Sequence, residues 1–176
     1  MSLKDRDVSL VSDPYWPERF EEERELIEDV CSRGLLGVFH VGTTAIPEVP
    51  GKPALDVIAV FEDEEAMEDT ADVLVEEHGF ERPEGSTIVI RWEDESAVFV
   101  KLHTEDDEKV RAQIAFRDYL LDHPDAREEY TAIKENAAEE HPEDLEAYTK
   151  TKGEFVSSII DQAKEAGYYE ELPDFA

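Results

Sequence analysis

The segment from His40 to Val60, HVGTTAIPEVPGKPALDVIAV, places the strictest limit on how this chain can fold. Acidic residues outnumber basic ones by 47 to 17 in the 176-residue chain, which gives a formal net charge of -30. Within this segment the charged residues are only Glu48, Lys52 and Asp56. Because the segment has so little charge in so acidic a chain, we predict that it contributes to the interior of the protein. We also predict that it holds a functional site and is not simply part of the surface.

The acidity itself is spread over the whole chain. Carboxylates recur in every predicted helix, so the excess describes the entire surface and not one tail. Self-repulsion at this density destabilises a compact fold in dilute buffer, whereas at molar salt the Debye length is about 3 Å and the penalty is largely screened. The composition therefore predicts adaptation to a salt-rich cytoplasm. The competing interpretation is a nucleic-acid mimic or cation buffer, which would not need the segment His40–Val60.

Composition also limits the class of protein. Hydrophobic residues make up 40% of the chain, which excludes an acidic disordered tail, and the length suits one domain over residues 1–176. No apolar run is long enough to span a bilayer, and the first ten residues lack a signal peptide. Cys31 has no cysteine to pair with. We expect a cytoplasmic protein with no membrane partner and no nucleic-acid partner, and the sequence is compatible with a homo-oligomer.

Hydrophobic periodicity predicts an α+β (α/β) fold, with a mixed sheet flanked by helices and a helical C-terminal half over about residues 108–167. The segment 54–61 is mostly apolar and rich in β-branched residues, as expected of a strand buried on both faces. The other strands are expected over 37–41, 86–92 and 97–103, the last two as an antiparallel pair. Helices are expected from Pro17 towards Gly34, around 66–79, and over 110–121, 124–139 and 142–166.

Between the first two predicted strands lies a set of residues suited to an anion. Gly42, Thr43 and Thr44 follow a strand and offer backbone N–H groups and hydroxyls to a phosphate. The proline-rich segment that follows contains Lys52, and Asp56 lies on the next predicted strand. A phosphate loop, a lysine and a carboxylate able to hold a divalent metal are what phosphoryl or nucleotidyl transfer requires. Alternatively, the glycine and threonines form an ordinary turn, and Asp56 is a hydrogen-bonded structural residue.

These residues carry a resemblance to a known family. HVGTTAIP at 40–47, followed by KP at 52–53 and LDV at 55–57, resembles the signature of the GrpB family. The resemblance runs in order from about Val8 to Ala166. Further matching positions are Tyr15-Trp16-Pro17, Phe20, Gly79-Phe80, Leu102-His103, Phe116 to Leu120, His123-Pro124, Tyr130, Lys134, Tyr148 and Lys152.

The resemblance implies a nucleotidyltransferase-like fold. Gly42, Thr43 and Thr44 would then form the triphosphate loop, with threonine replacing the family's usual serine at 43, and Asp56 would be the metal ligand, with magnesium or manganese as the ion. Active members of that superfamily carry a pair of carboxylates on this strand, whereas the partner position here is Ile58. Some relatives are fused to dephospho-coenzyme A kinase, which points to a nucleotide or coenzyme A context.

His40 and His103 are further candidates for the site, because both fall at ends of predicted strands. If they converge with Asp56 on one edge of the sheet, imidazole ligands favour zinc or manganese over magnesium, and either histidine is also a candidate acid or base. The alternative is that His40 hydrogen-bonds the loop and His103 caps a strand. Arg117 and Lys134 are candidate substrate cations, with surface ion pairs as the alternative.

Two functions of different class follow. The first is a transferase that moves a nucleotidyl or phosphoryl group to a small acceptor, using the residues of the predicted loop, Lys52 and Asp56. The second is a noncatalytic module that binds a nucleotide or small anion and has lost the paired carboxylates. Ile58 favours the second function. Both predict a nucleotide or other phosphorylated small molecule as the partner.

The surface charge generates a first prediction. We expect the melting temperature to rise as potassium chloride is increased from about 0.1 M to about 1 M, because the Debye length falls from about 10 Å to about 3 Å and screens the self-repulsion. Differential scanning calorimetry measures this. Sucrose at equal osmolality is the control, since it is excluded from the protein surface without screening charge. An equal rise in sucrose would contradict a charge-screening origin.

Overall fold

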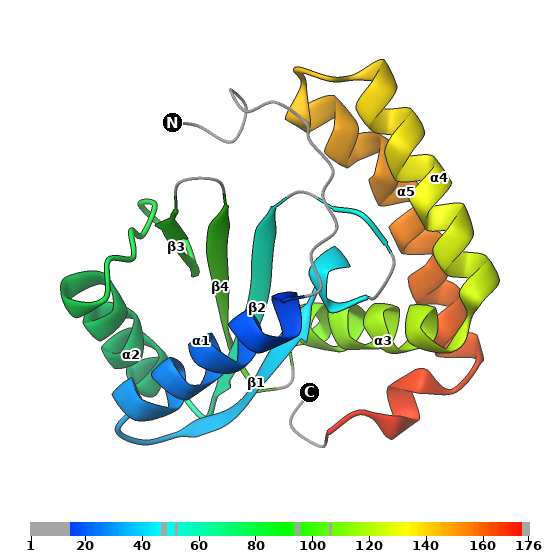
Figure 1. Cartoon of the computed structure of the whole chain (residues 1–176). Helices are drawn as coiled ribbons and strands as arrows, with labels where there is room; N and C mark the ends of the chain where they lie inside the picture. The colour runs from blue at the N-terminus through cyan, green and yellow to red at the C-terminus, as the bar shows by residue number, and fades with distance from the viewer. Residues whose placement is uncertain (1–14, 47–48, 52, 94–95, 106, 174–176) are drawn as a thin grey trace.

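The computed structural model describes residues 15–46, 49–51, 53–93, 96–105 and 107–173 (Figure 1). Pro47 and Lys52 of the predicted site, and the N-terminal residues in which no signal peptide was recognised, lie outside these ranges. The elements, in chain order, are α1 (Trp16–Val30), β1 (Leu35–Val41), the 3-10 turn η2 (Thr43–Ala45), β2 (Ala54–Phe61), α2 (Glu64–Glu77), β3 (Ile88–Trp92), β4 (Ala97–Thr104), α3 (Glu108–Asp122), α4 (Pro124–Glu140), α5 (Leu145–Glu165) and the 3-10 turn η3 (Tyr168–Glu171).

The four strands form one mixed sheet in the order β1-β2-β4-β3. β1 is antiparallel to β2, β2 is parallel to β4, and β3 is antiparallel to β4. The predicted α+β class, the mixed sheet and the antiparallel pair β3–β4 are therefore confirmed. The parallel pairing requires the chain to cross over between β2 and β4, and α2 with β3 supplies that connection.

β2 is the central strand of the core, and its two faces bury different side chains. Leu55, Val57, Ala59 and Phe61 point to one face, where they pack with residues of α1 and α2. The alternate positions point to the other face, where Ile58 and Val60 pack against α3 through Val110 and Ile114. This two-sided burial explains the continuous apolar run that marked the strand in the sequence.

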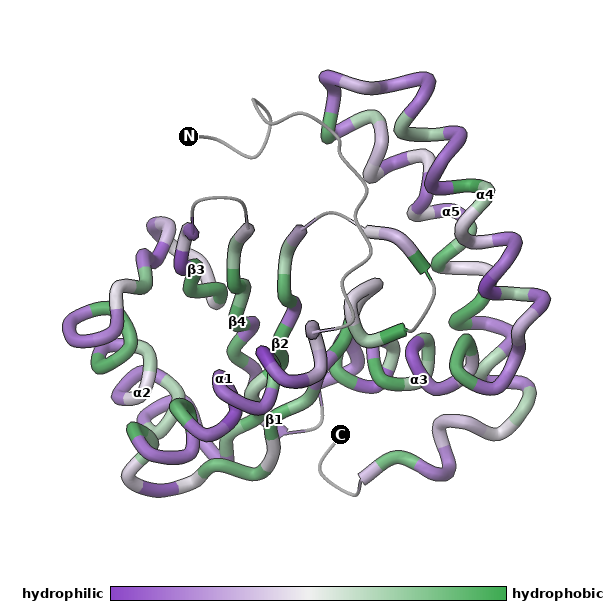
Figure 2. The backbone as a smooth tube through the Cα atoms, viewed as in Figure 1, coloured by the Kyte–Doolittle hydropathy of each residue, from purple (hydrophilic) through white to green (hydrophobic). Residues whose placement is uncertain are grey.

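The helical C-terminal half extends beyond the sheet. Figure 1 shows α4 and α5 side by side, with α3 running from the sheet towards them. The three helices share an apolar cluster that also holds Ile46 and Val49, so the segment between β1 and β2 is anchored to them. Along the helices, hydrophilic and hydrophobic positions alternate as expected of elements with one buried side (Figure 2). None of the described helices is both long and apolar enough to cross a membrane.

Two helix ends differ from the sequence expectation by three residues or more. α1 ends at Val30 and does not reach Gly34, because Cys31 is already extended. α5 begins at Leu145 and not at 142, with the Asp144 side chain accepting a hydrogen bond from the Ala147 N–H. Side-chain caps of this kind define a helix start more sharply than hydrophobic spacing does.

Ile58 provides a test of the packing between the sheet and α3. It is fully buried in the cluster that joins β2 to α3. We expect Ile58→Ala to lower the free energy of unfolding by about 3 kcal/mol, because it removes buried methyl groups and leaves a cavity. Guanidinium chloride denaturation measures the loss. Leu121→Ala is the control, since Leu121 on α3 is 41% exposed, and it should change stability by less than about 1 kcal/mol. A similar loss in both variants would contradict the assigned core.

Candidate functional site

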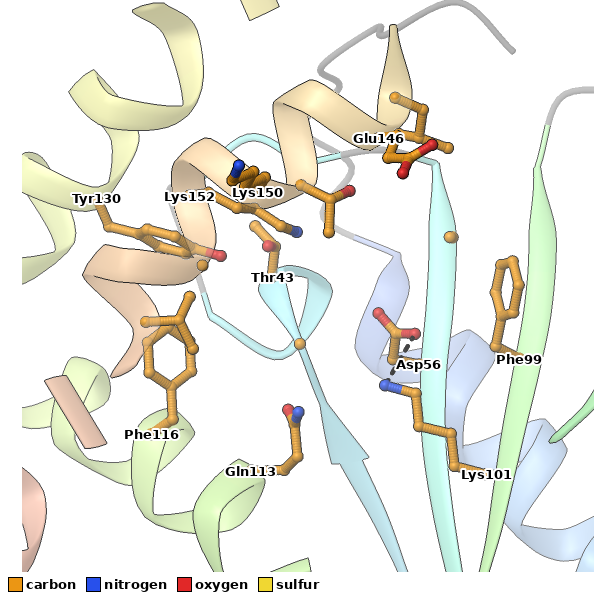
Figure 3. Close-up of a pocket in the computed structure, with 16 residues that line it drawn as sticks. Thr43, Asp56, Phe99, Lys101, Gln113, Phe116, Tyr130, Glu146, Lys150 and Lys152 are labelled. Carbon is orange, nitrogen blue, oxygen red and sulfur yellow. Dashed lines mark ion pairs between the residues drawn. The ribbon is translucent and has the colours of Figure 1, made fainter. Parts of the chain in front are cut away.

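A cleft of about 680 Å³ lies between the α3-facing side of the sheet and the C-terminal helices. Figure 3 shows how its walls come from segments far apart in the chain: the turn after β1, the strands β2 and β4, and the helices α3, α4 and α5. The side chains and backbone that line it include Gly42, Thr43, Asp56, Phe99, Lys101, Gln113, Phe116, Tyr130, Leu145, Glu146, Thr149, Lys150, Lys152 and Val156.

The cleft reverses the charge balance of the chain. Its lining contains three basic residues, Lys101, Lys150 and Lys152, and two acidic ones, Asp56 and Glu146. In the chain as a whole, 17 basic residues face 47 acidic ones. Lysines gathered around one concave surface create a local positive potential, and this potential favours the binding of an anion. The cleft is therefore suited to an anionic ligand.

The turn after β1 forms one wall of the cleft, and Gly42 fixes its position. Gly42 has a φ of +74°, a backbone conformation that residues with a Cβ rarely adopt. A Cβ at this position would also lie 2.5 Å from Oδ2 of Asp56. Glycine thus allows the turn to bend sharply and to lie directly against the carboxylate, and both Thr43 and Asp56 line the cleft (Figure 3).

Lys134 supports this turn from the helical side. The side chain is only 1% exposed, and its Nζ donates a hydrogen bond of 2.5 Å to Oγ1 of Thr43. The same ammonium lies 5.0 Å from the centre of the Tyr130 ring, in a cation–π arrangement. Lys134 therefore adds positive charge behind the turn and orients Thr43, and it is not among the residues that line the cleft.

Gly51 explains how a lysine from α4 reaches the turn. A Cβ at Gly51 would lie 2.8 Å from Cβ of Thr43 and 3.2 Å from Nζ of Lys134. The backbone at Gly51 passes so close to both side chains that a larger residue would displace one of them. In the sequence this glycine was only part of a proline-rich path, and its packing role requires the tertiary structure.

Asp56 lies on the α3-facing side of β2 and has a basic neighbour. Nζ of Lys101 lies 3.8 Å from Oδ1 of Asp56, and each side chain is 28% exposed. The parallel register places Asp56 opposite Phe99 and places Lys101 opposite Ile58, so the ion pair is diagonal across two strands. The dashed line in Figure 3 marks it. Lys101 could not be selected from the sequence, because nothing local indicates that its strand lies beside β2.

His40 points to the opposite face of the sheet from Asp56. It lies opposite Val57 in the antiparallel register, and its ring stacks on Phe20 of α1 with centroids 5.0 Å apart. Nε2 of His40 forms a 2.8 Å hydrogen bond with Oγ1 of Thr44. Burial lowers the pKa of His40 to about 4; the negative charge of Asp56 opposes this shift, and the positive charge of Arg117 adds to it. A neutral His40 therefore holds the turn from behind and does not line the cleft.

His103 is separated from Asp56 along the sheet. It lies four residues beyond Phe99, the β4 residue opposite Asp56, which corresponds to about 13 Å of strand. Its Nδ1 lies 2.7 Å from Oδ2 of Asp107, at the start of α3. Burial raises the pKa of Asp107, but the hydrogen bonds from the Lys109 N–H and the His103 ring outweigh it, so the pKa of this carboxyl lies below its ordinary value. His103 thus belongs to the junction of β4 and α3.

The expected convergence of the two histidines with Asp56 therefore does not occur. Strand alternation directs His40 to the far face, and the register moves His103 away along β4. Across the described residues, no group of three His, Cys, Asp or Glu side chains is close enough to hold a metal ion. Asp56 offers one carboxylate with an ammonium beside it, and a metal at this residue stays a prediction.

Arg117, the remaining predicted substrate cation, makes contacts within the fold. Nη1 of Arg117 donates a 3.2 Å hydrogen bond to the backbone oxygen of His40, and Nε donates a 2.9 Å bond to Oδ1 of Asp118. The side chain therefore connects α3 to β1 and does not line the cleft.

Several lining residues were missed by the sequence analysis as site residues. Lys150 and Lys152 contribute two of the cleft lysines, and Phe99 and Phe116 contribute aromatic surface. One signal was available in the sequence. The stretch from Thr149 to Gly153 contains two lysines and no acid, which is unusual in this chain.

Comparisons with known proteins agree with the fold. The GrpB protein family matches residues 8–162. The UPF0157 protein YqkA of Bacillus subtilis is 26% identical over 155 residues, which cover 85% of this chain and 45% of YqkA. Dephospho-CoA kinase of Mycolicibacterium paratuberculosis is 28% identical over 170 residues, which cover 80% of this chain and 42% of that protein. The chain thus spans less than half the length of either relative.

A solved structure shares the architecture. The crystal structure of conserved protein GrpB from Enterococcus faecalis matches with a TM-score of 0.77 and 25% sequence identity. The match covers 92% of this chain and 99% of that chain. The order of elements and the mixed sheet described above are therefore similar to those of a GrpB protein.

The depressed pKa of His40 generates a pH prediction. Unfolding raises that pKa from about 4 to its ordinary value of 6.5, so between these values the unfolded chain binds the additional proton. We expect the His40 contribution to stability to be retained above about pH 6.5 and lost progressively towards about pH 4, by up to about 3 kcal/mol. Denaturation at several pH values measures this loss against His40→Gln, which keeps a polar nitrogen near Thr44 but does not titrate. Parallel pH profiles for both proteins would contradict the assignment.

Proposed function

Given that the chain belongs to the GrpB family, we propose that its cleft binds a phosphorylated small molecule, with a nucleotide or coenzyme A precursor as the class of ligand. The observation that carries this proposal is the concentration of Lys101, Lys150 and Lys152 around one concave surface of a chain with a net charge of -30. Phosphate oxygens accept strong charge-assisted hydrogen bonds from ammonium groups. Thr43 adds a hydroxyl to the lining of the same cleft.

The rest of the cleft is suited to a less polar part of the ligand. Phe116, Tyr130, Leu145 and Val156 contribute apolar surface next to the basic side chains. Sites for small molecules combine mostly apolar walls with a few polar groups that fix orientation, in volumes of about 300–1,000 Å³. A ligand with both a phosphate and an aromatic ring or acyl chain matches this division. The name of the M. paratuberculosis relative, dephospho-CoA kinase, makes dephospho-coenzyme A one compound to test.

A second candidate function is transfer of a nucleotidyl or phosphoryl group. The observation that favours it is the position of Asp56, which lies at the cleft against Gly42, where the family resemblance expects a metal carboxylate. Transfer of this kind depends on divalent ions that neutralise phosphate charge. The two functions differ in one measurable respect, because transfer requires a metal at Asp56 whereas binding by lysines does not.

Isothermal titration calorimetry tests the binding proposal. We expect pyrophosphate, adenosine triphosphate or dephospho-coenzyme A to bind in about 0.5 M potassium chloride, where contact interactions persist while long-range charge is screened. The double variant Lys150→Gln, Lys152→Gln should weaken binding at least about tenfold, because each charge-assisted hydrogen bond contributes about 1.5–3 kcal/mol. Gly42→Val should abolish binding, because its side chain collides with Asp56.

The matched control is Lys164→Gln on the same helix. Nζ of Lys164 lies 3.4 Å from Oε1 of Glu108 at the surface, and the residue does not line the cleft. This variant should bind as the wild type does. Equal weakening in the Lys164 and the Lys150/Lys152 variants would show that general surface charge, and not the cleft, determines affinity. Titrations with EDTA and with magnesium then separate binding from metal-dependent transfer.

A further inference from the structure

The residues around Asp56 do not match the needs of a divalent metal. The other strand positions that could supply a carboxylate on this face are taken by apolar or basic side chains: Ile58 is buried in the core, and Phe99 and Lys101 occupy the neighbouring strand. A metal ion bound in proteins through carboxylates requires several oxygen ligands. Among the described residues, Asp56 has no second carboxylate or imidazole that completes such a set.

The Asp56 carboxylate forms an ion pair with an ammonium. Nζ of Lys101 lies 3.8 Å from Oδ1, and both side chains project from adjacent parallel strands towards the cleft. A divalent cation at Asp56 would lie close to this fixed positive charge, and the repulsion would oppose metal binding. The ammonium supplies positive charge at the same place, so a phosphate can bind there without a metal.

We propose that Lys101 replaces a divalent metal in this cleft, with its ammonium held by Asp56 and donating a hydrogen bond to a phosphate oxygen of the ligand. Asp56 is then a positioning residue that orients Lys101. The same cleft is lined by Lys150 and Lys152 of α5 and by Thr43 (Figure 3), so the ligand meets further polar groups there. The ligand part of this inference rests on the proposed function, whereas the part that concerns metal binding does not.

Manganese binding, measured by electron paramagnetic resonance of free Mn²⁺ in about 0.5 M potassium chloride, tests the metal part. Surface carboxylates bind manganese weakly in any protein this acidic, so the informative comparison is between wild type and Asp56→Asn. We expect the same manganese uptake by both, with affinities within about twofold. A manganese ion that binds to wild type and is lost in Asp56→Asn would overturn the inference.

A gain of metal binding provides the complementary test. Lys101→Glu places a second carboxylate beside Asp56 in place of the ammonium, and we expect it to create a manganese site at least tenfold tighter than any in the wild type. The double variant Lys101→Glu, Asp56→Asn should lose that site, which locates it in the cleft. If Lys101→Glu binds manganese no better than the wild type, the ammonium is not what excludes the metal and the inference is wrong.

Pyrophosphate in EDTA tests the ligand part. We expect Lys101→Met to bind it at least tenfold more weakly than wild type, and Lys109→Met, a surface lysine on α3, to bind it unchanged. Binding that appears only when manganese is added and depends on Asp56 would overturn the inference. No binding under either condition would overturn the proposed function together with the role of Lys101 as a phosphate ligand, while the manganese comparison would still decide the metal part.

Discussion

The structure depends on one strand, β2, which is paired on both edges and buried on both faces. Its antiparallel pairing with β1 and parallel pairing with β4 place it at the centre of the sheet. Its apolar side chains join two separate cores, one with α1 and α2 and the other with α3. A strand buried in this way is held firmly in register, because a shift by one residue would exchange its two faces. Asp56 is consequently held in one position relative to the cleft.

Because side-chain direction alternates along β2, residues two positions apart point to the same face, and that face contributes to both the core and the cleft. Asp56 and Ile58 point to the same face of β2, but Ile58 is covered by α3, whereas Asp56 lies where the cleft opens between the sheet and α5. The position two residues from Asp56 is therefore part of the packing that attaches α3. A carboxylate at Ile58 would be buried among apolar side chains, at a large desolvation cost. The missing second carboxylate is thus a consequence of core packing in this chain.

The turn after β1 is supported from two sides by residues that do not reach the ligand space. His40 bonds Thr44 from the α1 side, and Lys134 bonds Thr43 from the α4 side. These contacts join the sheet to the helical half, since the bond from Lys134 connects residues 91 positions apart in the chain. Buried polar groups that are satisfied in this manner fix local geometry because losing a partner would leave them desolvated and unpaired. The turn is accordingly positioned before any ligand binds.

Sequence alone determined the elements, the mixed sheet and the importance of the segment from His40 to Val60, because periodicity, glycine and proline positions act locally. It also identified Gly42, Thr43 and Asp56, which do meet at the cleft. Sequence could not determine which strand lies beside β2, since pairing between distant segments depends on the packing of the whole chain. In that pairing Lys101 lies beside Asp56, whereas His103 lies farther along β4. Because side chains alternate along a strand, His40 points to the other face. Tertiary structure therefore decided that a lysine, and not a histidine, forms the ion pair with the carboxylate.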